Sequence, residues 1–114
     1  MATSNLTTTV RKVNGASVID IKGDVTGLAE NALMDAYAQA SDGGVATIVL
    51  NFNELDYLNS SGIGLLVTML IRTQRQKQSL RACGLSDHYV EIFKLTRLDE
   101  AIGIFNNESE ALAA

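Results

Sequence analysis

Two neighbouring hydroxyl side chains, Ser60 and Ser61, lie within the stretch LDYLNSSGIGLL (55–66). The apolar run before them is typical of a strand and the run after them of a helix, so both serines lie at the expected start of a helix. The first N–H groups of a helix have no partner inside it, and Asn or Ser side chains often accept hydrogen bonds from them. We therefore expect at least one of Asn59, Ser60 and Ser61 to cap this helix.

Phosphorylation is a second chemical use for a serine in this position. The free N–H groups and the helix dipole stabilise an anion, so a phosphate here would gain hydrogen-bond donors. It would also add a charge of about −1.5 to −2 to a surface that a partner has to approach. Capping and phosphorylation are compatible, and the three letters SSG alone do not separate them.

Enzymatic interpretations of the same stretch fit poorly. Gly62 and Gly64 follow a strand and open a helix, but the third glycine of a dinucleotide-binding fingerprint would fall at position 67, which is Val67. A nucleophilic serine needs a base, and the single histidine, His88, lies on a separate expected helix. Cys83 is interpreted as a small core residue. The sequence therefore predicts a protein that is not an enzyme and that needs no metal or cofactor.

Composition narrows the class of partner. The chain has 114 residues, with nine basic and thirteen acidic side chains and a net charge of −4, which argues against nucleic acid as a partner. The longest apolar stretch, IGLLVTMLI, is too short to span a bilayer. The first ten residues lack the pattern of a signal peptide, and a single cysteine excludes an internal disulfide. We expect one cytoplasmic domain, residues 1–114, that binds neither nucleic acid nor membrane.

Hydrophobic periodicity predicts the order ββαβαβαβα. Asn14-Gly15 is a two-residue hairpin signal, so the first two strands should be antiparallel. The run VATIVLNF is continuously apolar, which suits a central strand buried on both faces. A helix is expected from about Leu28 to Ala40, ended by Gly43-Gly44. The remaining expected elements are the strands 6–13, 17–23, 45–52, 79–84 and 101–105 and the helices 61–77, 86–98 and 107–114.

This order indicates an α/β fold in which a mixed sheet of four to five strands carries the helices. The loops at Asp24, at Asp56–Ser60 and near Gly84 should then share the carboxyl edge of the sheet, where α/β proteins bind ligands and partners. The helix after the serines has an apolar stripe formed by Ile63, Leu66, Val67, Leu70 and Ile71.

Leu65 and Met69 lie on another face of that helix, where a helix that covers a sheet should be polar. Two interpretations are open: they pack under a neighbouring helix or loop, or they form a partner surface beside the serines. Such a surface would suit a homodimer as well as a different partner.

The whole chain resembles the STAS-domain anti-sigma factor antagonists. LDYLNSSGIGLL is similar to the family's signature, an aromatic or apolar residue followed by Asp-Ser-Ser/Thr-Gly-Leu/Ile-Gly. SLRACGLS resembles the fourth strand and its loop, and IFKLTRLDEAIGIFNNESEALAA resembles the third helix, last strand and terminal helix. The resemblance implies a single STAS-like domain.

The family also implies a mechanism. The unphosphorylated protein binds an anti-sigma factor, usually a GHKL-type serine kinase, and thereby frees a sigma factor that regulates transcription. The kinase uses ATP and Mg²⁺ to phosphorylate the first serine of the motif, the charged product leaves, and a PP2C-type phosphatase dependent on Mn²⁺ or Mg²⁺ resets it. On this chain the phosphoacceptor would be Ser60, and Ser61 would serve the helix start.

Two positions depart from the family pattern. The residue before the phosphorylated serine, usually Asp, is Asn59, and the second acid of the pair after strand two is Thr26, whereas Asp24 is retained. These departures leave open a second hypothesis, a non-switching scaffold or interaction module such as a stressosome STAS subunit. The expected partner-binding residues are Asp24, Thr26, Asn59, Ser60, Ser61, Gly62, Ile63, Leu65 and Met69.

Overall fold

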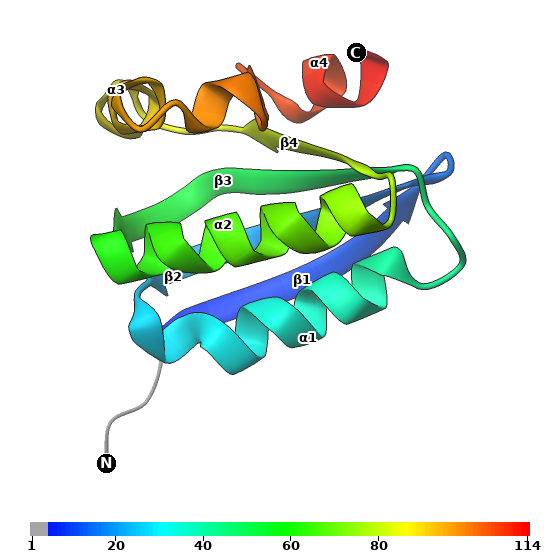
Figure 1. Cartoon of the computed structure of the whole chain (residues 1–114), viewed down its shortest axis with the longest axis horizontal. Helices are drawn as coiled ribbons and strands as arrows, with labels where there is room; N and C mark the ends of the chain where they lie inside the picture. The colour runs from blue at the N-terminus through cyan, green and yellow to red at the C-terminus, as the bar shows by residue number, and fades with distance from the viewer. Residues whose placement is uncertain (1–4) are drawn as a thin grey trace.

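A computed structural model describes residues 5–114 and shows a five-stranded sheet with helices packed on it (Figure 1). The strands follow one another across the sheet in the order β1-β2-β3-β4-β5, with β1 antiparallel to β2 and every later pair parallel. The mixed α/β sheet predicted from the sequence is therefore confirmed. In chain order the elements are β1 (Leu6–Val13), β2 (Ala16–Val25), the 3-10 helix η1 (Gly27–Ala29), α1 (Glu30–Ser41), β3 (Thr47–Leu58), α2 (Ser60–Arg75), β4 (Ser79–Cys83), α3 (Asp87–Leu95), the 3-10 helix η2 (Leu98–Glu100), β5 (Gly103–Phe105) and α4 (Glu108–Ala113).

The turn between β1 and β2 has the geometry that the sequence predicted. Asn14 and Gly15 have φ angles of 49° and 83°, and positive φ at both positions is what a two-residue type I′ turn requires. The turn pairs Val13 with Ala16 and sets the register of the whole hairpin.

The central strand is longer than predicted. Ile48, Val49 and Leu50 have no exposed surface, as expected for a strand covered on both faces. However, β3 continues to Leu58, where it pairs with Val25, so the expected loop at 56–60 is wrong. The pairing of β2 with β3 continues through the more polar residues 53–57, with two shifts in register along the way. Asn59 alone separates β3 from α2, which fixes the start of the helix tightly to the sheet.

The buried face of α2 differs from the predicted stripe at two positions. Met69 is fully buried in the core, whereas Ile71 is 44% exposed. The buried residues of this helix are Gly62, Leu66, Met69, Leu70 and Thr73. Leu66 and Leu70 of the predicted stripe are therefore buried as expected, and Ile63 and Val67 pack against the core. The assignment of Met69 to a partner surface is therefore wrong. Leu65 is half-buried and packs against the core.

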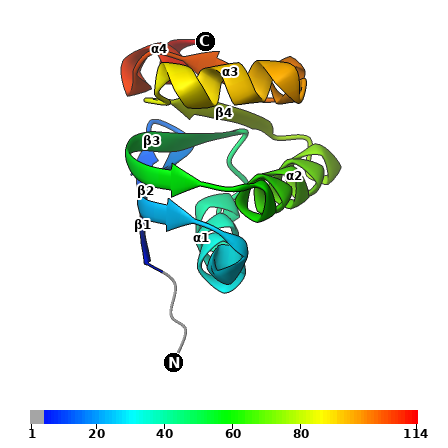
Figure 2. The same ribbon diagram turned by 90° about the vertical axis from the view of Figure 1, so that its left-hand side faces the viewer.

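The two faces of the sheet are covered unequally. A large apolar core lies between the sheet and α1, α2 and α3, and its buried side chains include Leu33, Leu66 and Phe93 from these helices. The opposite face holds a smaller cluster to which α4 contributes Ala111. Figure 2 shows α1 and α2 together beside the sheet, with α4 near its β4 side. No helix within residues 5–114 is long and apolar enough to cross a membrane.

Candidate partner-binding site at the start of α2

The cap of α2 is Asn59. Its side-chain Oδ1 accepts a hydrogen bond from the Gly62 N–H at 2.9 Å, and its carbonyl accepts from the Ile63 N–H at 2.9 Å. An extended backbone at Asn59 (φ −106°, ψ −179°) is the usual conformation of a capping residue. The expectation that one of the three polar residues caps the helix is confirmed. Ser61 was expected to serve the helix start. It does not cap the helix, because the Asn59 side chain supplies the cap.

Ser60 and Ser61 are the first two residues of α2, and both are exposed. Gly62 lies directly behind them, pressed against the end of β2: a Cβ on Gly62 would overlap the Val25 carbonyl oxygen. The same oxygen accepts a hydrogen bond from the Asn59 N–H at 3.3 Å. Glycine is thus required at position 62, because the first turn of α2 contacts the backbone of Val25.

The loop after β2 lies against the same turn. A Cβ on Gly27 would lie 3.4 Å from the Cβ of Ser61, which places η1 beside the second serine. Thr26 caps η1, since its Oγ1 accepts from the Leu28 N–H at 3.3 Å. Asp24 lies opposite Tyr57 in the sheet and accepts from the Asn5 side chain at 3.3 Å.

The structure therefore brings most of the predicted residues together at the carboxyl edge of β2 and β3. Asp24, Thr26, Asn59, Ser60 and Ser61 surround the start of α2, and Gly62 lies beneath them. Ile63 and Leu65 are half-buried against the core. Met69 lies apart from this surface because the core encloses it.

Two exposed apolar side chains at this edge were not among the predicted site residues. Leu28 is 58% exposed and Tyr57 is 50% exposed. The sequence predicts that the first amphipathic helix begins at about Leu28, but Leu28 lies in η1, before α1 begins. Tyr57 is part of the quoted motif, and its exposure follows from the extension of β3, in which Leu58 points inward. Aromatic side chains such as Tyr57 are enriched in protein interfaces relative to the rest of the surface.

The charge at this edge is mainly acidic. Asp24 is half-buried and Asp56 is exposed, whereas the nearby Lys22 is paired with Glu54 at 3.6 Å on the surface. The basic residues of α2, Arg72 and Arg75, lie at its opposite end.

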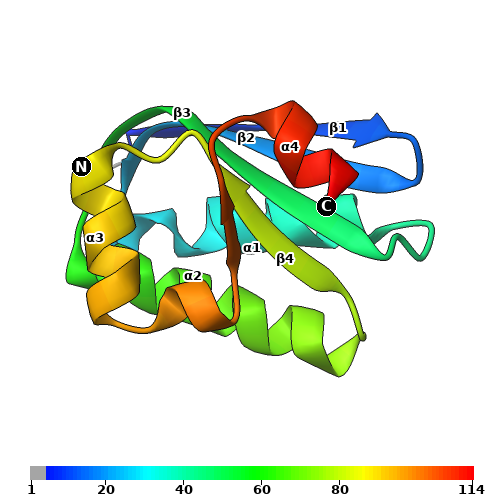
Figure 3. The same cartoon turned by 90° about the horizontal axis from the view of Figure 1, so that it is seen from above.

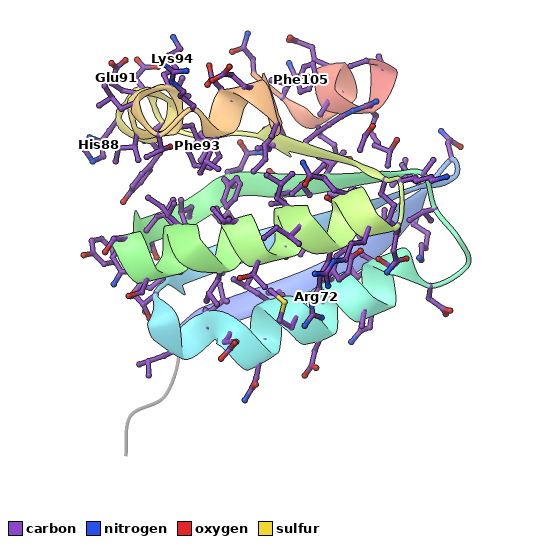
Figure 4. All side chains as sticks on the ribbon, in the orientation of Figure 1. Arg72, His88, Glu91, Phe93, Lys94 and Phe105 are labelled. Atoms are coloured by element: carbon purple, nitrogen blue, oxygen red, sulfur yellow. The ribbon has the colours of Figure 1, made fainter. Side chains whose placement is uncertain are left out.

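The single histidine belongs to a different part of the surface. His88 is exposed on α3, with its ring edge-on to Tyr89 and the two ring centres 5.0 Å apart. Figure 4 shows His88 at the outer side of α3. Within residues 5–114 no hydrogen bond joins His88 to Ser60 or Ser61. Tyr89 instead ties α3 to the site, because its hydroxyl accepts a hydrogen bond from the Leu58 N–H at 3.0 Å.

Comparison with known proteins places this chain in one family. Residues 8–105 match the family model described as "Mlab, STAS domain". BtrV of Bordetella bronchiseptica, a proposed anti-sigma factor antagonist, is 24% identical over 106 residues, which are 93% of this chain and 91% of BtrV.

Solved structures share the fold. An anti-sigma factor antagonist from Mycobacterium paratuberculosis superimposes with a TM-score of 0.81 at 19% identity, covering 95% of this chain and 92% of that one. The Bacillus cell-fate determinant SpoIIAA in its phosphorylated form superimposes with a TM-score of 0.69 at 22% identity, covering 94% and 97%. The family resemblance stated from the sequence is confirmed. The chain belongs to the STAS domain family.

Proposed function

We propose that this protein is an anti-sigma factor antagonist that binds an anti-sigma factor of the GHKL serine kinase type and is switched off by phosphorylation of Ser60. The observation that carries the proposal is the exposure of Ser60 as the first residue of α2, in the middle of the surface described above. Family membership supports it, as do the name of BtrV and the existence of SpoIIAA in a phosphorylated form. Binding would release a sigma factor and so regulate transcription in the cytoplasm.

The start of α2 is suited to holding a phosphate. The four N–H groups at the start of α2 that have no partner within the helix are those of residues 59–62. The Asn59 N–H donates to the Val25 carbonyl, and the Gly62 N–H donates to the Asn59 side chain. The N–H groups of Ser60 and Ser61 are left for an anion, and the helix dipole adds to their effect. A phosphorylated Ser60 would therefore be stabilised within the protein itself.

The same phosphate would weaken partner binding. It adds a charge of about −1.5 to −2 to an edge that already carries Asp24 and Asp56. A partner that fits the unmodified edge, including Leu28 and Tyr57, would have to desolvate this charge, at a cost in affinity. The kinase would use ATP and Mg²⁺ for the transfer, and a PP2C-type phosphatase would reverse it.

Asn59 is compatible with this switch. Asparagine and aspartate cap helices about equally well, and the Asn59 cap is formed. The change from the family's usual aspartate therefore preserves the position of Ser60 and removes one negative charge beside it.

A kinase assay tests the proposal. The protein is incubated with a GHKL-type serine kinase from its own organism and ATP, and the phosphate is mapped by mass spectrometry. We expect modification at Ser60 and none in Ser60→Ala, while the matched variant Ser61→Ala is still modified. Ser60→Ala should bind the kinase, and Ser60→Asp should bind more weakly in calorimetry. Phosphate on another residue, or none with any such kinase, would contradict the switch.

The departures at Asn59 and Thr26 favour a second candidate, a non-switching STAS scaffold. Thr26 is occupied in capping η1, so it replaces an acidic contact by a structural one. A scaffold would bind its partner with the same affinity before and after phosphorylation. Size-exclusion chromatography with light scattering separates the two, because a scaffold forms large assemblies and an antagonist gives a monomer, a homodimer or a small complex.

A further inference from the structure

The face of the sheet opposite α1 and α2 carries a small apolar patch formed by Val18, Val49 and Cys83. These three side chains are fully buried. Ala111 of α4 closes the cluster, and Phe105 and Leu112 pack at its margin. Among residues 5–114, α4 is the one helix that contributes a buried side chain to this cluster. Figure 3 shows α4 lying over the sheet, and Figure 4 shows Phe105 beside it.

An arginine on the edge strand fastens α4 to the sheet. The Arg11 guanidinium donates to Glu108 at 2.5 and 3.2 Å, and it donates to Asp20 at 2.6 and 2.9 Å. The side chains of Arg11 and Glu108 are 39% and 29% exposed. A second arginine, Arg81 on β4, donates to the Ala111 carbonyl at 2.7 Å. The attachment of α4 is therefore largely polar and reachable by water.

The helix itself adds little to its own stability. It has six residues, whereas isolated helices shorter than about 12 residues are marginal in water. Its cap is local, because among the described residues the Asn107 side chain bonds only to Glu110. Order in α4 thus depends on one buried alanine, a partly buried leucine and the two arginines.

Opening of α4 would leave the hydrogen bonds among Arg11, Asp20 and Asn51 intact. Arg11 would keep its two hydrogen bonds to Asp20, and Asp20 would keep its bond from the Asn51 side chain at 2.8 Å. The large core on the other face contains no residue of α4. Because few interactions are lost, the free energy of this opening is much smaller than the free energy of global unfolding.

We propose that α4 is a cover that opens as a unit while the sheet stays folded, exposing the patch of Val18, Val49 and Cys83, with the Arg11–Glu108 ion pair as its clasp. The device lies on the face away from α1 and α2. It does not depend on the function assigned to Ser60.

Labelling of Cys83 with DTNB tests this cover in the intact 114-residue chain. Burial raises the pKa of the Cys83 thiol to about 11, so the closed form reacts slowly and reaction reports opening. We expect a labelling rate that hardly changes with urea below the global transition, because a local opening exposes little surface. A rate that rises with urea in parallel with global unfolding would overturn the proposal.

Two isosteric variants of the same helix test the clasp. Glu108→Gln removes the ion pair, and we expect labelling to accelerate about fivefold, in keeping with a charge-assisted bidentate pair that is partly exposed. Glu110→Gln is the control, since Glu110 contacts Asn107 within its own cap, and its rate should stay within about twofold of the parent. Equal rates in the two variants would refute the role of Arg11 and Glu108.

Amide hydrogen exchange gives an independent readout. The α4 amides, including that of Ala111, should exchange far faster than those of Ile48–Leu50 in β3, which open only on global unfolding. Glu108→Gln should accelerate the α4 amides by the same factor as Cys83 labelling. Equal exchange free energies for α4 and β3 would show that α4 does not open separately.

Discussion

The contact between Gly62 and the end of β2 makes a prediction about the two glycines of the motif. A Cβ added at Gly62 would overlap the Val25 carbonyl oxygen and would lie 2.8 Å from the Val25 carbonyl carbon and 3.0 Å from Leu58 Cδ1. A Cβ added at Gly64 would meet nothing within 4 Å. Substitution by alanine should therefore have opposite effects at positions two residues apart in one helix.

The magnitude follows from three contributions. Overpacking against backbone costs about 1–3 kcal/mol, and displacement of the first turn weakens the hydrogen bond from Asn59 N–H to the Val25 carbonyl, worth about 1 kcal/mol. Alanine regains about 0.5–1 kcal/mol of helix propensity. Gly62→Ala should thus lower the free energy of unfolding by about 1–3 kcal/mol, whereas Gly64→Ala should raise it by about 0.5–1 kcal/mol.

Urea unfolding followed by circular dichroism measures both variants under one set of conditions. Because the two substitutions are chemically identical and share a helix, their difference isolates the contact with β2. A Gly62→Ala protein as stable as Gly64→Ala would refute the placement of α2 against Val25.

The remaining predictions concern single polar groups. Asn59→Ala removes the α2 cap and should cost about 1 kcal/mol in urea unfolding, while Asn59→Asp should cost nothing; equal losses would contradict the cap. Tyr89→Phe deprives the Leu58 N–H of its acceptor and should cost about 1 kcal/mol in thermal unfolding; an unchanged melting temperature would argue against this bond. Hydrogen bonds from Arg11 lower the pKa of Asp20 from 3.8, so the Asp20 ion pair stabilises the fold fully above this pH and loses its effect as the pH falls through the lower folded pKa. The stability difference between the parent and Asp20→Asn, measured in urea at a series of pH values, should therefore shrink as the solution is acidified below about pH 4.

The elements that local chemistry determines could be predicted from the sequence. Positive φ at Asn14 and Gly15 fixes the hairpin, and the β-branched run around Val49 can be buried only as a central strand. The polar residues before α2 predicted a cap, and Asn59 forms it.

What could not be predicted depends on contacts between elements. The burial of Met69 and the exposure of Ile71 depend on how α2 packs on the sheet, where Gly62 lies against the end of β2. The residues 53–58 are too polar to read as a strand, but pairing with β2 keeps them extended to Leu58. The hydrophobic periodicity of a single segment cannot reveal either the packing of α2 on the sheet or the pairing of β3 with β2.

The sequence predicted where the site lies in the fold, but not all of the contacts within it. The carboxyl ends of β2 and β3 meet at one edge in any parallel pair, so the loop of Asp24 and the motif of Ser60 were expected to adjoin. The contact of Gly27 with Ser61 and the exposure of Leu28 depend on the 3-10 turn η1. The sequence predicted a helix over Leu28, because its spacing to Ala32 and Ala36 is helical.

The affinity of the anti-sigma factor for the two forms of this protein tests the proposed switch most directly. Isothermal titration calorimetry with unmodified protein and with protein phosphorylated at Ser60 gives both dissociation constants. We expect tight binding of the unmodified form and binding at least about tenfold weaker after phosphorylation, a difference of about 1.4 kcal/mol or more. Equal affinities of the two forms would contradict the switch.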